Sequence, residues 1–169
     1  MKKYVYLILV MFSISSLKAQ SDLEYQFDFA RASLAQRNIK DAIEALKIVY
    51  EAEPENANVN FLMGAAYTEL SGTEEEAMRH LLQAVQNVNT NYKVGSFEEK
   101  AAPIHVFYYL AVAYVEENKC AFANRAFEEF QKYSEKVDQY YIDEVDRHMQ
   151  KGPHDKKENT EGWNKLKVE

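Results

Sequence analysis

The stretch that decides the fold is residues 57–85, ANVNFLMGAAYTELSGTEEEAMRHLLQAV. Its apolar residues recur at steps of three and four, which is the period of a helix, and Gly72 interrupts the pattern in the middle. The spacing therefore predicts two helices joined by a turn. Gly64 and Ala77 are the small residues of the two halves, and small residues let paired helices approach closely.

The same pattern occurs three times along the chain. The small residue of the first helix and the alanine of the second lie twelve, thirteen and twelve positions apart (30 to 42, 64 to 77, 111 to 123). The three first-helix motifs are Phe29-Ala30-x2-Ser33, Met63-Gly64-x2-Tyr67 and Leu110-Ala111-x2-Tyr114, and the three second-helix motifs are Ala42-x3-Leu46-x2-Val49, Ala77-x3-Leu81-x2-Ala84 and Ala123-x3-Phe127-x2-Phe130. A repeated pair of helices predicts a stacked, all-α architecture.

This pattern resembles the tetratricopeptide repeat, a helix–turn–helix unit of about 34 residues. The resemblance implies a right-handed solenoid of three helix pairs, with repeats at 23–56, 57–90 and 104–133 and an insertion at 89–103. Two details depart from the family: Ser33 stands where an aromatic residue is usual, and one extra residue lies around Gly72. A generic helical bundle remains the alternative, because helical periodicity alone does not separate the two.

Capping boxes also mark helix starts, because a hydroxyl and a carboxylate three residues later satisfy free N–H groups there. The sequence offers three, Ser21-x-x-Glu24, Thr73-x-x-Glu76 and Ser96-x-x-Glu99.

The C-terminal part predicts a seventh helix and a tail. An apolar stripe recurs every four residues at Val137, Tyr141, Val145 and Met149. It predicts a helix over 134–151 that caps the last repeat, because a stacked solenoid must cover its final apolar face. Residues 152–169 are polar and mixed in charge, which predicts a disordered tail, and the sequence assigns no role to Trp163 within it.

Residues 1–19 have the order of a secretory signal peptide. Lys2 and Lys3 precede an uncharged, mostly apolar run over 4–17, and Ala19 supplies the small residue at a cleavage site before Gln20. An uncleaved anchor is the rival interpretation, but a bilayer crossing needs about 20 apolar residues. We therefore expect an exported protein without a transmembrane segment after cleavage, located in the periplasm, with association to the outer membrane left open.

Composition excludes several classes of function. The chain has 20 Lys+Arg against 27 Asp+Glu, a net charge of −7, which disfavours nucleic acid as a partner. Its single cysteine excludes an intramolecular disulfide and a multi-cysteine zinc site.

A closer resemblance rests on residues 102–114, APIHVFYYLAVAY, followed by AFEEF at 126–130 and IDEVDRHM at 142–149. These stretches resemble the N-terminal repeat modules of OmpA-like peptidoglycan-binding proteins that continue into a TolB-like β-propeller, some of them linked to gliding and type IX secretion. The Ala19-Gln20 junction resembles those of bacteria with these systems. This sequence ends where the propeller begins in such proteins, so the resemblance implies a docking module and not wall binding.

The solenoid places the first helix of each pair on its concave face. Counting in register predicts a partner-binding groove lined by Phe27, Arg31, Leu34, Phe61, Thr68, His105, Tyr108, Val112 and Val115. Chaperone-binding members of the family clamp a carboxylate with Lys and Asn at such positions. Three aromatic residues stand there instead, so we expect hot-spot contacts with an apolar partner segment. Whether the insertion or the tail covers some of these rings stays open.

Signatures of catalysis are absent from the sequence. There is no nucleophile elbow, no Gly-rich phosphate loop and no His-Glu-x-x-His motif. Cys120 with His105 as base is the only thiol pairing to consider, and an inert, packed thiol is the simpler interpretation. His80, His105, His148 and His154 share no helix at ligand spacing.

We therefore predict a non-catalytic scaffold or adaptor that binds an envelope or secretion-system protein, with no cofactor, metal or small-molecule substrate. The alternatives are a self-associating structural subunit and, least favoured, a thiol or hydrolase enzyme.

Overall fold

The structure is a computed structural model that describes residues 2–133, 135 and 137–151, and only the backbone of residues 2–18, 145, 146 and 148–151. Within these ranges the chain is all-helical, as predicted, and its only sheet-like feature is an isolated bridge between Val88 and Ala102. The helices are α1 (Lys2–Ala35), α2 (Ile39–Ala52), α3 (Ala57–Tyr67), α4 (Glu74–Ala84), α5 (Val106–Glu116), α6 (Cys120–Gln131) and α7 (Gln139–Lys151).

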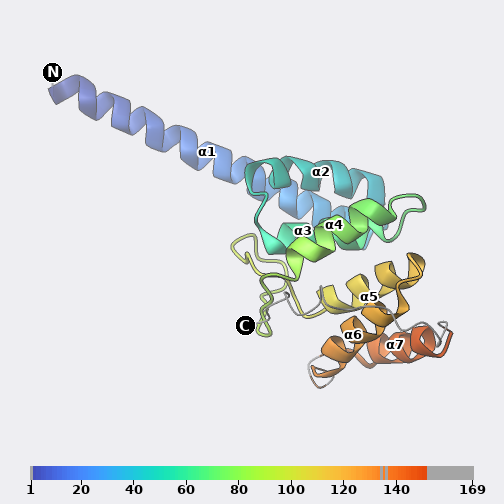
Figure 1. Cartoon of the computed structure of the whole chain (residues 1–169). Helices are drawn as coiled ribbons and strands as arrows, with labels where there is room; N and C mark the ends of the chain where they lie inside the picture. The colour runs from blue at the N-terminus through green and yellow to red at the C-terminus, as the bar shows by residue number, and fades with distance from the viewer. Residues whose placement is uncertain (1, 134, 136, 152–169) are drawn as a thin grey trace.

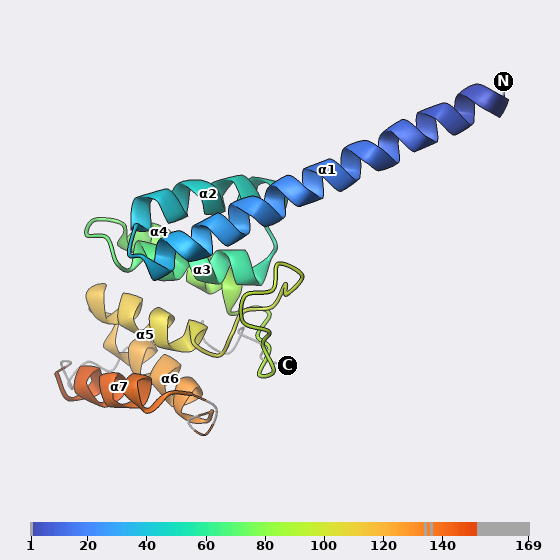
Figure 2. The same ribbon diagram turned by 180° about the vertical axis from the view of Figure 1, so that it is seen from behind.

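Neighbours in sequence are neighbours in space (Figure 1). Helix α1 packs on α2, α3 on α4 and α5 on α6, and these pairs are joined by contacts of α2 with α3 and of α4 with α5. Helix α7 contacts both α5 and α6. The N-terminal part of α1 projects away from the other helices in both views (Figures 1 and 2). No helix in the part of the chain that the structure describes is both long and apolar enough to cross a bilayer.

Small residues lie where the pairs cross, as the repeat pattern predicts. Ala30, Ala42, Ala77, Ala111 and Ala123 are all at most 1% exposed. The closest approach is in the second pair, because a Cβ atom added to Gly64 would lie 2.5 Å from Leu81 Cγ and 3.2 Å from its backbone nitrogen. Such a distance leaves no room for a methyl group, so glycine sets the spacing of α3 and α4.

The turn within each pair contains a left-handed residue. Arg37 has φ 61°, Gly72 has φ 83° and Asn118 has φ 56°. Glycine adopts this conformation freely, and asparagine is the side chain that tolerates it best. Arg37 and Asn118 lie two positions after the ends of α1 and α5, and the next N–H donates back to Ser33 O and Tyr114 O, whereas Gly72 lies five positions after the end of α3.

The three predicted capping boxes do not form side-chain caps. Ser21 lies inside α1 and Ser96 lies in the insertion, so neither begins a helix. Thr73 precedes α4, but its hydroxyl donates to Tyr67 O at 2.8 Å and Leu70 O at 2.9 Å and caps nothing. A side-chain cap is made by Asn56, whose Oδ1 accepts from the N–H groups of Asn58 and Val59.

Two apolar clusters form the core. One joins the first two pairs around Phe27, Leu46 and Met63. The other joins the second and third pairs around Phe107 and Phe127. Val137, Tyr141 and Ile142 pack against this second cluster, so the described part of the predicted 134–151 stripe covers the last pair. The side chains of Val145 and Met149 and the predicted tail with Trp163 lie outside the described residues.

Candidate functional site

Two adjoining hollows run along α1, α3 and α5, the helices that follow one another in Figure 2. They share Phe61, Leu62 and Tyr109, and we call the surface they form the inner groove. The larger hollow, about 360 Å³, is also lined by Arg31, Asn89, Thr90, Tyr92, Val94, Gly95, Pro103, Ile104, His105 and Tyr141. The smaller, about 250 Å³, is also lined by Leu34, Arg37, Ile39, Ala65, Ala66 and Glu69.

The floor of the inner groove is an aromatic pair. The rings of Phe61 and Tyr109 meet edge to face, with centroids 5.8 Å apart. Burial, followed by the neighbouring Tyr141 hydroxyl, raises the pKa of Tyr109 well above its usual value, so the phenol stays protonated at neutral pH. The floor is therefore an uncharged surface with a hydroxyl group at one side.

Helix α7 closes one side of the groove through Tyr141. Its ring lies 4.7 Å from that of His105 and 5.1 Å from that of Tyr108. Burial lowers the pKa of His105, which keeps the imidazole neutral at pH 7. Burial, with the carboxylate of Glu144 as the next cause, raises the pKa of Tyr108 to about 12. This wall is therefore aromatic.

The insertion at 89–103 forms the opposite wall. Asn58, fully buried in α3, holds it by donating from Nδ2 to Glu99 O at 3.1 Å and by accepting from the Tyr92 hydroxyl at 2.6 Å. The backbone N–H of Asn58 donates to Lys100 O at 3.3 Å. One buried asparagine therefore binds three positions of the insertion, and the loop is part of the folded structure.

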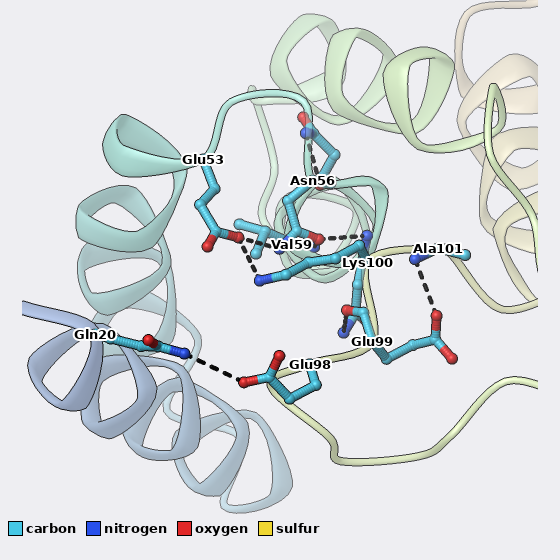
Figure 3. A network of polar contacts seen from close by, with 10 residues as sticks. Gln20, Glu53, Asn56, Val59, Glu98, Glu99, Lys100 and Ala101 are labelled. Carbon is cyan, nitrogen blue, oxygen red and sulfur yellow. Dashed lines mark hydrogen bonds and ion pairs between the residues drawn. The ribbon is translucent and has the colours of Figure 1, made fainter. Parts of the chain in front are cut away.

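A second set of contacts anchors the insertion to the first helix pair (Figure 3). Lys100 Nζ lies 2.6 Å from Glu53 Oε2. It also lies 4.4 Å from the centre of the Phe97 ring. Burial raises the pKa of Glu53, but hydrogen bonds from Lys100 and Asn56 outweigh it, and the pKa lies below its usual value. Phe97 in turn packs edge-on against Phe27, at 5.6 Å. The insertion thus covers Phe27, which is 1% exposed, and leaves the groove floor uncovered.

Arg31 places a positive charge in the larger hollow. Its Nη1 donates to Gly95 O at 3.1 Å, and its guanidinium lies 6.0 Å from the centre of the Phe27 ring. Gly95 has φ 83°, and a Cβ atom there would lie 2.6 Å from Arg31 Nη1. Among the described residues that line this hollow, Arg31 is the only charged side chain. In the smaller hollow, Arg37 and Glu69 neutralise each other at 2.8 Å.

The structure brings together some of the predicted groove residues. Arg31, Leu34, Phe61 and His105 line the hollows, whereas Phe27, Thr68, Tyr108, Val112 and Val115 do not. Thr68 turns its hydroxyl to Ala65 O at 2.8 Å, and Tyr108 packs on Phe130 and Tyr141. Leu62 and Tyr109 were missed, although each directly follows a predicted groove residue and they stand in register with one another. The insertion residues carried no helical pattern that could place them.

His80 is the most buried of the described histidines, at 1% exposed. Its Nδ1 lies 2.8 Å from Asn60 Oδ1, and Asn60 Nδ2 donates to the carbonyls of Pro54 and Asn56. This assigns the ring N–H to Nδ1. Nε2 then accepts from Arg79 Nη2 at 3.1 Å. Burial, followed by the Arg79 charge, lowers its pKa to about 4. The ring is a neutral part of the core.

The structure keeps Cys120 and His105 apart. Cys120 begins α6 and His105 precedes α5, so the eleven residues of α5, roughly 16 Å at about 1.5 Å per residue, separate them. No group of three or more His, Cys, Asp or Glu side chains among the described residues is placed to hold a metal ion.

No protein-family model matches the chain, and a search of curated proteins finds no match either.

Proposed function

We propose that this chain is a non-catalytic scaffold that binds a segment of a partner protein in the inner groove. In this proposal the three helix pairs form a right-handed tetratricopeptide-type solenoid, and α7 caps its end. The repeated small residues, the contacts between successive pairs and the presence of a left-handed residue in the turn of each pair support that architecture.

The observation that carries the proposal is the continuity of the groove over three helices. Phe61, Leu62 and Tyr109 line both hollows, so one partner segment can contact α1, α3 and α5 together. Aromatic and aliphatic side chains in a sheltered hollow supply the anchor contacts from which protein interfaces gain most of their affinity. Two adjoining hollows suit an extended or helical segment that inserts successive apolar side chains.

The proposed location is the cell envelope. The support is residues 1–19, whose basic start, apolar run and small residue at position 19 are typical of a signal peptide. The partner is then an envelope or secretion-system protein, as the resemblance of the third repeat to envelope docking modules also suggests.

A matched pair of substitutions tests the groove. Leu62→Glu places a carboxylate on the half-buried floor, and the control Asn124→Glu places one on the exposed side of α6, outside the described hollows. Each variant and the wild type are used to recover binding proteins from an envelope fraction, and circular dichroism confirms that each is folded. We expect Leu62→Glu to reduce recovery of the groove partner at least about tenfold, since burying an unpaired charge opposes binding. Equal recovery by the Leu62→Glu variant and the wild type would remove the groove proposal.

A further inference from the structure

A second apolar surface lies on the first helix pair, on the side away from the inner groove. Three of its side chains are large, apolar and exposed: Tyr25 at 65%, Phe29 at 45% and Ile48 at 48%. Phe29 and Ile48 line a hollow of about 250 Å³ between α1 and α2, together with Gln26, Asp41, Glu44 and Ala45. We call these seven residues the outer face. Large apolar side chains gathered around a hollow are typical of interaction surfaces.

The register of the repeats shows what shape this surface has. When Ala30, Gly64 and Ala111 are aligned, Tyr25, Gln26 and Phe29 of the outer face correspond to Val59, Asn60 and Met63 in α3 and to Val106, Phe107 and Leu110 in α5. All six of those residues are at most 2% exposed. They are covered because α2 packs on α3 and α4 packs on α5. In the second and third pairs, the position that corresponds to the outer face is covered by a helix of the preceding pair.

No helix within the described ranges occupies this position on α1. Helix α1 packs on α2, and α2 also packs on α3. At the opposite end of the array α7 covers the last pair. The two ends of the described structure thus differ, one being covered by a helix and the other being open.

The charge of the outer face indicates which helix would bind there. Asp41 and Glu44 line its hollow, and no Lys or Arg among the described residues does so. Both carboxylates are exposed, and neither takes part in an ion pair within the described part of the chain. An apolar strip beside unpaired carboxylates complements an amphipathic helix whose apolar stripe is flanked by Lys or Arg. A second copy of this chain, with its net charge of −7, would bring like charges together.

We propose that the outer face binds a basic amphipathic helix of another protein, which packs on α1 and α2 as α2 packs on α3. This is a second interaction surface, separate from the inner groove, with Asp41 and Glu44 at its hollow where the larger hollow of the groove has Arg31. Its partner is defined by aliphatic residues at helical spacing with lysine or arginine on both sides.

The test uses two synthetic helical peptides with the full-length chain. Both carry the apolar residues of α2 at the spacing of Ile43, Leu46 and Val49; one has lysine at the flanking positions and the other has glutamate. Fluorescence anisotropy measures their binding. We expect the lysine peptide to bind at least about tenfold more tightly than the glutamate peptide, and added salt to reduce that difference.

Variants then locate the binding. Phe29→Ala should weaken the lysine peptide about tenfold, and the double change Asp41→Asn with Glu44→Gln should bring the two peptides to within about twofold of each other. Leu62→Glu in the inner groove should leave the binding unchanged. Because Phe29, Asp41 and Glu44 are exposed, these variants should fold, which circular dichroism checks.

Several outcomes would overturn the proposal. These are no binding of the lysine peptide up to about 1 mM, equal binding of the two peptides, or loss of binding in Leu62→Glu. Analytical ultracentrifugation gives a further criterion, because a dimer that Phe29→Ala converts to a monomer would show that a second copy is the occupant.

Discussion

Helix α1 carries two apolar surfaces on opposite sides, and they differ in charge and enclosure. Arg31 and Leu34 line the inner groove, whereas Gln26 and Phe29 belong to the outer face. The inner groove has walls from the insertion and α7 and a cation in its larger hollow. The outer face is open and carries carboxylates. Substitutions of the buried side chains beneath the inner groove should therefore alter folding, while substitutions on the outer face should alter binding alone.

The largest expected effect contrasts two phenylalanines two positions apart. Phe27 is 1% exposed beneath Phe97, whereas Phe29 is 45% exposed. Phe27→Ala should lower the free energy of unfolding by about 3–5 kcal/mol, because it leaves a cavity in the core, and Phe29→Ala by less than about 1 kcal/mol. Urea unfolding of both variants measures the difference. Equal losses would show that the two sides of α1 are not distinct.

A smaller effect is expected on acidification. Because the pKa of His80 falls from its usual 6.5 to about 4 in the folded protein, the unfolded chain binds the proton more strongly. The contribution of His80 to stability is therefore complete above pH 6.5 and is lost as pH falls towards 4, by about 3 kcal/mol. Urea unfolding at several pH values measures it.

His80→Gln is the comparison for this pH dependence. The variant should lose most of the slope between pH 6.5 and 4.5, and keep a remainder because burial also lowers the pKa of His105. The effect of Glu53 falls below this window, since its pKa lies under 4.5 in the folded protein. A slope that is the same in wild type and variant would contradict the neutral, buried His80.

A smaller effect is expected in the insertion, which forms a wall of the inner groove and has no counterpart on the outer face. Asn58→Ala removes the side-chain hydrogen bonds to Glu99 O and the Tyr92 hydroxyl, which should weaken the docking of the insertion by about 1–2 kcal/mol. Hydrogen exchange of residues 92–101 should then rise about tenfold. Asn91→Ala, an exposed change in the same loop, should leave exchange unchanged. An insertion that exchanges equally in both variants would contradict its anchoring by α3.

The smallest effect is expected at the rim of the groove. Arg37 and Glu69 form an ion pair at 2.8 Å between largely exposed side chains. Arg37→Ala should change stability by no more than about 0.5 kcal/mol, because water screens such pairs. A thermal melt that shifts by as much as that of Phe27→Ala would show that this pair holds the first two helix pairs together.

The repeat pattern was sufficient to predict the helices, because it records a local steric requirement. Two helices that cross closely need a residue such as Gly64 at the crossing, and that requirement recurs at fixed spacing. Helix starts were predicted less well. A serine followed by a glutamate, as at Ser21, satisfies the capping pattern without any helix beginning there, while Asn56 caps α3 without the pattern.

The groove was predicted only in part, because two of its walls depend on contacts between distant parts of the chain. Asn58 holds Tyr92 34 positions later in the sequence, and Phe97 covers Phe27. Neither contact produces a periodic pattern of residues that could be recognised in the sequence. The position of Tyr141, whose ring contacts Tyr108, depends in the same way on the packing of α7, while the neighbouring Tyr109 lines the hollows.

The most direct test of the groove is site-specific photo-crosslinking in cells that produce the protein. A photoreactive phenylalanine analogue is placed at Leu62 on the groove floor and, as a control, at exposed Asn124 on α6. We predict one cross-linked product from Leu62, formed with an apolar segment of an envelope protein, and none from Asn124. No product from Leu62, or the same product from both positions, would contradict binding in the inner groove.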